Sequence, residues 1–206
     1  MTSDSKKRIV KAGYDAIAAQ YLATRTEDSA DVQLLGELIQ RLPRGAQVLD
    51  AGCGSGVPVT RILSRAFQVT GVDFSEAQIA LARQLVPEAQ FVCQDMTQLT
   101  FPDNSFDAVV SYYAIIHIPR EEHRQLLAKF YRLLKPAGFV LLCLGAGDLA
   151  DDVEDFLGTA MYWSHYDAAT NLSLVRECGF EVIWARMIAD SLDPSARHLF
   201  VLAQKH

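Results

Sequence analysis

The chain has 206 residues, half of them hydrophobic, and a formal charge of −6 at pH 7. This length supports one substantial core and is too short for two ordinary domains with linkers. The acidic balance argues against a nucleic-acid partner, so a small-molecule partner fits better. The polar amino terminus and short apolar stretches give neither a secretion signal nor a membrane span. We expect a soluble cytoplasmic protein that does not engage a membrane, as a monomer or homodimer.

Apolar side chains at helical spacing predict two helices before any strand, over residues 9–25 and 35–42. Together they form an N-terminal helical cap, residues 1–44. Tyr14 and Tyr21 are seven residues apart and therefore project from one face of the first helix. Either core packing or contact with a ligand would explain them.

The segment VLDAGCGSG, residues 48–56, is the most informative in the chain. A short apolar run ends in Asp50, and glycines then alternate with small residues. This pattern predicts a buried strand, a turn with a bare backbone and a following helix, a junction where nucleotide-type cofactors bind. A dinucleotide fingerprint needs a small residue where Val57 stands, and the lysine of a phosphate-binding loop is missing.

Strands and helices alternate along the rest of the chain, which predicts an α/β fold with a doubly wound parallel sheet. The last two strands are joined too closely for a helical crossover and should form an antiparallel hairpin. The expected strands are residues 46–50, 67–72, 89–93, 106–112, 138–145, 180–187 and 197–204, and the helices are 57–65, 75–86, 120–134 and 167–178.

Residues 146–166 lie outside this alternation and follow the end of the fifth strand, on the side where a ligand should bind. Their acidic start is expected to be a solvated helix start. The aromatic residues that follow make the segment a candidate substrate lid. The expected substrate-binding residues are Tyr162, Trp163 and Tyr166.

The glycine segment resembles motif I of class I S-adenosylmethionine-dependent methyltransferases. The resemblance continues in order through VTGVDFS (69–75), FVCQDM (91–96), FPDNSFDAVVS (101–111) and LKPAGF (134–139), where Ala137 replaces a second glycine of many relatives. It implies one domain, with a cofactor-binding core over 45–145 and a C-terminal helix and hairpin over 167–206. The implied fold is a Rossmann-like seven-stranded sheet ending in an antiparallel hairpin.

The resemblance also implies the cofactor, S-adenosylmethionine, with S-adenosylhomocysteine as product. Asp73 would accept both ribose hydroxyls, Asp95 the adenine amine, and Asp50 the loop amides or the ammonium. Alternatively, each acid only caps the turn that follows it. The expected cofactor-binding residues are Asp50, Gly52, Cys53, Gly54, Gly56, Asp73, Phe74, Asp95, Met96, Ser111, Tyr14 and Tyr21.

For a general base, His165 and His117 are the best candidates, with His165 slightly favoured because it lies in the lid. A structural hydrogen bond is an equal explanation for His117. Tyr113 could instead orient the nucleophile, whereas His123 and His198 are expected to be surface or strand residues. The four cysteines have no metal-binding spacing, so no metal is expected, and Cys53 fits a small loop filler better than a nucleophile.

The favoured function is transfer of a methyl group to oxygen or nitrogen of a small molecule, with carbon less favoured. A base-methylating enzyme is disfavoured because Ser111-Tyr112-Tyr113-Ala114 lacks the Asn/Asp-Pro-Pro-Tyr/Phe motif. Two alternatives stay open. The chain could be a non-catalytic S-adenosylmethionine-binding module or an NAD(P)-dependent oxidoreductase.

Overall fold

A seven-stranded sheet forms the centre of the computed structural model, which describes residues 1–190, 192–193 and 195–206. Ser191 and Pro194, in the expected hairpin loop, lie outside the described residues. The strands of this sheet are β1 Gln47–Ala51, β2 Gln68–Asp73, β3 Gln90–Cys93, β4 Phe106–Ser111, β5 Leu134–Gly145, β8 Phe180–Ala189 and β9 Arg197–Lys205.

The strand order is β3-β2-β1-β4-β5-β9-β8, and only β9 runs against its neighbours. This confirms the predicted doubly wound sheet with a terminal antiparallel hairpin. Because β1 to β5 are parallel, the loops after β1, β2, β3 and β4 meet at one edge of the sheet. The start of β9 lies at the same edge, since His198 pairs with Gly145 at the end of β5.

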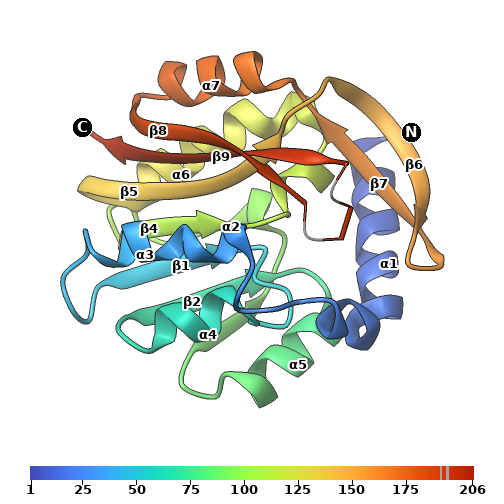
Figure 1. Ribbon diagram of the computed structural model, residues 1–206, viewed down its shortest axis with the longest axis horizontal. Helices are drawn as coiled ribbons and strands as arrows, with labels where there is room; N and C mark the ends of the chain where they lie inside the picture. Colours follow the sequence, from blue (N-terminus) through green and yellow to red (C-terminus); the bar gives the residue numbers. More distant parts are fainter. Residues whose placement is uncertain (191, 194) are drawn as a thin grey trace.

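Helices cover both faces of the sheet (Figure 1). The helices α6 and α7 bury Phe130 and Val175 in one core, whereas α3 and α4 bury Leu38 and Leu63 in the other. The described helices are α1 Ser3–Ala23, α2 Ala30–Gln33, α3 Leu35–Ile39, α4 Val59–Ser64, α5 Glu76–Leu85, α6 His123–Leu133 and α7 Ala168–Glu177, with 3-10 turns η1 Met96–Gln98, η2 Ile115–His117 and η3 Arg120–Glu122. None of these described helices combines the length and apolarity needed to cross a bilayer.

The segment expected to begin with a helix is a β-hairpin, so that expectation is wrong. Strand β6, Leu149–Phe156, pairs with β7, Thr159–His165, through a two-residue turn at Leu157 and Gly158. Both turn residues have positive φ, at 55° and 87°, as a tight hairpin requires. The acidic side chains of β6 are mostly exposed, because the hairpin packs mainly through β7.

The hairpin holds α1 over the carboxyl edge of the sheet (Figure 1). Met161 and Tyr162 of β7 are fully buried against Val10 and Ile17 of α1. Helix α1 begins six residues before the predicted start, with Thr2 accepting a capping hydrogen bond from the Ser5 amide. The N-terminal cap is therefore a layer in which α1 and β7 support each other.

Candidate active site

Three connected hollows open where α1 crosses the carboxyl edge of the sheet. We call them the inner pocket, between Asp73, Asp95 and Tyr14, the loop pocket, between Asp50 and Arg25, and the hairpin pocket, between Trp163 and His198. Their open space, part of it continuous with solvent, is about 580, 380 and 840 Å³ respectively. Tyr21 and Tyr113 border all three pockets.

The glycine loop after β1 forms one wall of the inner pocket. Gly52 has φ of +81°, and a side chain there would overlap the methyl group of Ala114, so only glycine fits. The amides of Gly52 and Cys53 both donate to the Val72 carbonyl, at 2.7 and 3.0 Å. The loop therefore offers its bare backbone surface to a ligand and keeps these amides for the fold.

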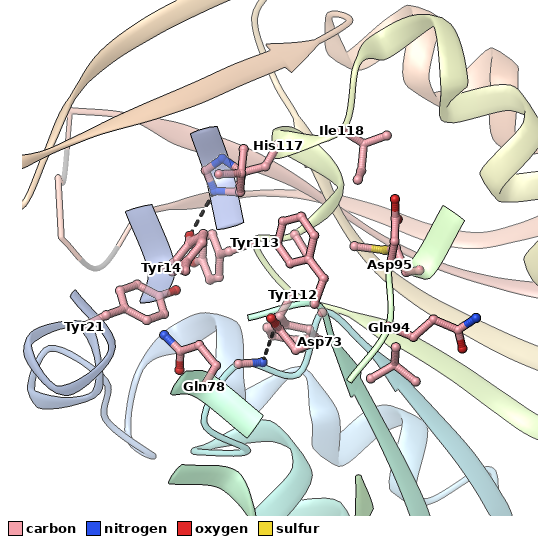
Figure 2. A pocket seen from close by; sticks show the side chains of 17 residues that line it. Tyr14, Tyr21, Asp73, Gln78, Gln94, Asp95, Tyr112, Tyr113, His117 and Ile118 are labelled. Carbon is pink, nitrogen blue, oxygen red and sulfur yellow. Dashed lines mark hydrogen bonds between the residues drawn. The ribbon is translucent and has the colours of Figure 1, made fainter. Parts of the chain in front are cut away.

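Asp73, at the end of β2, faces the inner pocket (Figure 2). Its two carboxylate oxygens accept from the amides of Ser75 at 2.9 Å and Gly54 at 3.0 Å. Burial raises the pKa of Asp73 to about 6, because these hydrogen bonds only partly replace water. A ligand that donates to the remaining lone pairs would stabilise the charged carboxylate.

Asp50, at the tip of β1, lies beneath the glycine loop and borders the loop pocket. It is 1% exposed and accepts from the Thr60 hydroxyl at 2.6 Å. Burial and the neighbouring Asp73 raise the pKa of Asp50 to about 7. Asp50 and Asp73 thus form a buried acidic pair that favours a ligand rich in donors or positive charge.

Asp95, after β3, caps the turn that follows it and also lines the inner pocket. It caps η1, since one oxygen accepts from the Thr97 amide at 2.8 Å, and its other oxygen forms an ion pair with Lys7 at 3.2 Å. It also lines the inner pocket beside Gln94, Met96 and Phe74. The pocket therefore combines this carboxylate with apolar surface that could hold a flat ring.

Tyr14 and His117 form a fixed pair at the top of the inner pocket (Figure 2). His117 Nδ1–H donates to the Tyr162 carbonyl at 2.8 Å, so Nε2 accepts from the Tyr14 hydroxyl at 3.0 Å. Burial lowers the pKa of His117 to about 4, which keeps the ring neutral. With both nitrogens engaged, His117 suits the structural role better than that of general base.

Several predicted residues lie away from the three pockets. Tyr162 is fully buried under α1, and Tyr166 packs near Arg120, whose guanidinium carbon lies 4.9 Å from its ring centre. His165 donates from Nδ1 to the Gly147 carbonyl at 2.7 Å, outside the pocket linings. Of the three expected substrate-binding residues, only Trp163 lines one of these pockets.

Two further members of the expected cofactor set support the pocket from behind. The Ser111 hydroxyl donates to the Ala51 carbonyl at 2.8 Å, which joins β4 to β1 below the pocket floor. Gly56 faces Val86 and Phe91, where an added Cβ would lie 3.2 and 3.3 Å from their side chains. Both residues therefore act on the fold around the pocket and do not line it.

Two side chains with reactive chemistry are buried. His123 was expected at the surface, and this is wrong: it is 2% exposed and donates from Nε2 to the Ile118 carbonyl at 2.9 Å. Cys53 borders the loop pocket, where burial raises the pKa of its thiol well above the ordinary value. An unionised thiol of this kind is a poor nucleophile and fits the role of loop filler.

Gln78 and Arg25 are among the pocket residues that sequence reasoning missed. Gln78 of α5 lines the inner pocket, and both atoms of its buried amide lack a partner among the described residues (Figure 2). Arg25, just after α1, borders the loop pocket with its side chain 7% exposed and 3.5 Å from Asp31. An amide among the buried positions of α5 was a usable signal for Gln78, whereas no local pattern marks Arg25.

Tyr113 has an unusual backbone at the exit of β4. Its φ of +54° is rare for a bulky residue and is maintained only where the surroundings impose it. The side chain is 8% exposed, and its hydroxyl has no partner among the described residues. The strained turn thereby places a free hydroxyl where the three pockets meet.

The sheet order and the glycine loop after its first strand define the class I methyltransferase fold. Residues 48–138 match the sequence model of a family described as "Methyltransferase domain". This match covers less than half of the chain, and over that part the chain is similar to a methyltransferase domain.

Individual relatives agree with this assignment. The chain is 28% identical to YqeM of Bacillus subtilis over 74% of this chain and 66% of YqeM. It is 39% identical to 2-methyl-6-phytyl-1,4-hydroquinone methyltransferase of Synechocystis over 50% of this chain but only 33% of that protein. The chain thus spans between a third and two thirds of the length of these relatives.

A solved structure shares the fold over the whole chain. It is the 1,6-didemethyltoxoflavin-N1-methyltransferase of Burkholderia thailandensis, with its substrate and S-adenosylhomocysteine bound. The TM-score is 0.78 at 19% identity, and the match covers 100% of this chain and 91% of that chain.

Proposed function

We propose that the protein is an S-adenosylmethionine-dependent methyltransferase that methylates oxygen or nitrogen of a small planar molecule. The observation that carries this proposal is the inner pocket, where the buried carboxylate of Asp73 and the unpartnered amide of Gln78 flank a bare glycine loop. Two acceptor oxygens and a free amide match a ligand rich in hydroxyl groups. The domain family supports the same conclusion.

The residues present fit the proposed cofactor along its length. Asp73 would hold the ribose hydroxyls, and Asp95 the adenine amine against the apolar side chain of Met96. Arg25, at the loop pocket, carries a positive charge suited to the amino-acid carboxylate. Asp50 faces the same pocket and would favour the ammonium.

When bound, the cofactor supplies a methyl group already activated by a sulfonium, so the chain's own residues have to align the acceptor and exclude water. Tyr14, Tyr21 and Tyr113 form an aromatic wall between the inner and hairpin pockets. Tyr14 is fixed by His117, and the two act as positioning residues.

The acceptor would enter from the hairpin pocket, which shares Tyr14, Tyr21, Tyr113 and His117 with the inner pocket. Trp163 and Phe156 complete an aromatic lining, with ring centres 5.5 Å apart. Flat molecules suit such a lining. The names of two similar proteins support this size and shape, a hydroquinone methyltransferase and a didemethyltoxoflavin methyltransferase.

Calorimetry with S-adenosylhomocysteine tests the cofactor assignment. We expect binding by the wild type and about 10- to 100-fold weaker binding by Asp73→Asn, because a hydrogen bond to a charged group is lost. Asp103→Asn, an exposed carboxyl on the turn before β4, is the matched control and should bind normally. Absence of binding by the wild type, or preferential binding of NAD, would reject the proposal.

Turnover separates an enzyme from a passive binding module. The protein is incubated with methyl-labelled S-adenosylmethionine and a panel of hydroquinones, phenols and aromatic amines, and labelled product is counted. We expect transfer to at least one class. Binding of the cofactor without transfer to any class would favour the non-catalytic module.

A further inference from the structure

The charged side chains that line the hairpin pocket are mainly negative. Its lining includes three carboxylates, those of Glu154, Asp190 and Asp193. Arg25 is the single lysine or arginine in the lining that the structure describes, and it is partly neutralised by Asp31 at 3.5 Å. Negative charge among aromatic rings disfavours an anionic ligand and favours a cation.

Asp190 and His198 form a hydrogen-bonded pair in this pocket. One oxygen of Asp190 accepts from the amides of Leu192 at 2.6 Å and Asp193 at 3.2 Å, which fixes the carboxylate. Its other oxygen lies 3.0 Å from His198 Nε2. His198 therefore donates from Nε2 and leaves Nδ1 as a lone-pair acceptor.

Nδ1 of His198 is buried and has no partner among the described residues. The hydroxyl of Tyr113 is also buried and without a partner among the described residues. The rings of Tyr113 and His198 pack edge to face, with centres 5.1 Å apart. A buried acceptor without a donor costs free energy, so a ligand that brings an N–H group would relieve it. Since Tyr113 also borders the inner pocket, such a group would lie next to the bound cofactor.

We propose that the methyl acceptor is an arylalkyl amine, which binds as its ammonium ion, stacks its ring in the hairpin pocket and donates from its nitrogen to His198 Nδ1. This inference rests on the proposed function and names its substrate class. Before transfer, the ammonium proton of the bound amine passes to His198 Nδ1, and Asp190 stabilises the resulting imidazolium. The freed nitrogen lone pair then forms the new bond to the methyl carbon as the carbon–sulfur bond breaks, with its electron pair going to sulfur.

Glu154 adds to the negative charge at the mouth of the pocket. It lies on β6 two residues before Phe156, so both side chains face the pocket, whereas Asp155 between them does not line it. The neighbouring carboxylate of Asp152 raises the pKa of Glu154, as expected where like charges gather. Asp155 is thus a matched control for Glu154 on the same strand.

Binding of three probes of one shape tests the proposal without knowledge of the natural acceptor. Protein saturated with S-adenosylhomocysteine is titrated by calorimetry at pH 7.5 with 2-(aminomethyl)naphthalene, 2-naphthalenemethanol and 2-naphthoic acid. We expect the amine to bind at least about tenfold more tightly than the acid, since charge decides between them. The neutral alcohol should fall between the two.

Variants identify the groups responsible. His198→Leu should weaken the amine about tenfold with little effect on the acid, because the buried acceptor is lost. Glu154→Gln combined with Asp193→Asn should narrow the ratio of amine to acid affinity several-fold, whereas Asp155→Asn should leave it unchanged. None of these changes should alter the affinity for S-adenosylhomocysteine.

The outcomes separate this inference from the proposed function. Equal or tighter binding of the acid overturns the amine assignment, and so does failure of all three probes to bind the saturated protein. A ratio that is unaffected by both His198→Leu and the double variant overturns it as well. Failure of S-adenosylhomocysteine itself to bind rejects the proposed function instead.

Discussion

Single residues at the glycine loop show how local chemistry and tertiary contact combine. Position 52 has positive φ and no room for a side chain, and the second constraint comes from the loop after β4 meeting the loop after β1. Tyr113, on that second loop, has positive φ without being glycine. The same contact therefore fixes the shape of the pocket wall and the position of its free hydroxyl.

The change Gly52→Ala should destabilise the protein by about 2 kcal/mol or more, because strain at positive φ adds to the overlap with Ala114. Denaturation in urea measures the free energy of unfolding. Gly36→Ala in α3 is the control, since a Cβ there meets nothing within 4 Å, and it should be neutral or stabilising by up to about 1 kcal/mol. Equal stability of the two variants would contradict this explanation.

At the scale of elements, α1 is positioned by the β6–β7 hairpin and by one hydrogen bond to η2. The Tyr14 hydroxyl donates to His117, and Lys6 lies 2.6 Å from Asp151 of β6. These contacts cross between segments more than 100 residues apart, so the roof of the inner pocket depends on the completed fold.

The change Tyr14→Phe should leave the buried Nε2 of His117 without a donor and cost about 1 to 3 kcal/mol of unfolding free energy. It should also weaken binding of S-adenosylhomocysteine, because Tyr14 lines the inner pocket. Tyr131→Phe, whose hydroxyl donates to the exposed carboxyl terminus at 3.0 Å, is the control. If Tyr14→Phe and Tyr131→Phe behave alike in both measurements, α1 is not held in this way.

At the scale of the whole molecule, stability depends on pH through buried carboxyl and imidazole groups, whose pKa values burial shifts in opposite directions. Burial raises the pKa of Asp50 to about 7 and lowers the pKa of His117 and His123 to about 4. The stability that Asp50 contributes is full below its unfolded pKa of about 4 and is lost as pH rises through about 7. The histidines lose stability in the other direction, as pH falls from about 6.5 to about 4.

The change Asp50→Asn isolates the carboxyl, since the amide oxygen can still accept from Thr60. The stability of the variant relative to the wild type should rise between pH 4 and pH 7, by up to about 4 kcal/mol, because the wild type must ionise a buried group. Urea denaturation at several pH values measures this difference, with exposed Asp103→Asn as control. A difference that does not vary with pH would show that Asp50 titrates normally.

The alternation of strands and helices and the acidic carboxyl edge of the sheet could be predicted because they depend on local patterns. Alternating apolar runs, a glycine loop and acids at strand ends are visible over a few residues. The terminal hairpin followed from the shortness of its connection. The prediction of a helix start in the acidic segment was wrong, because charge alone does not distinguish a helix start from an exposed strand. The turn at Leu157 and Gly158 was the overlooked signal.

The amino-acid order alone was enough to define the sheet, its direction and the acids that line its edge, since each depends on neighbours along the chain. It could not tell which of the five histidines line a pocket. His198 reaches the hairpin pocket because antiparallel β9 begins where β5 ends, while His165 turns toward Gly147. Such placements depend on which distant segments pack together, and long-range packing leaves no mark in a local pattern.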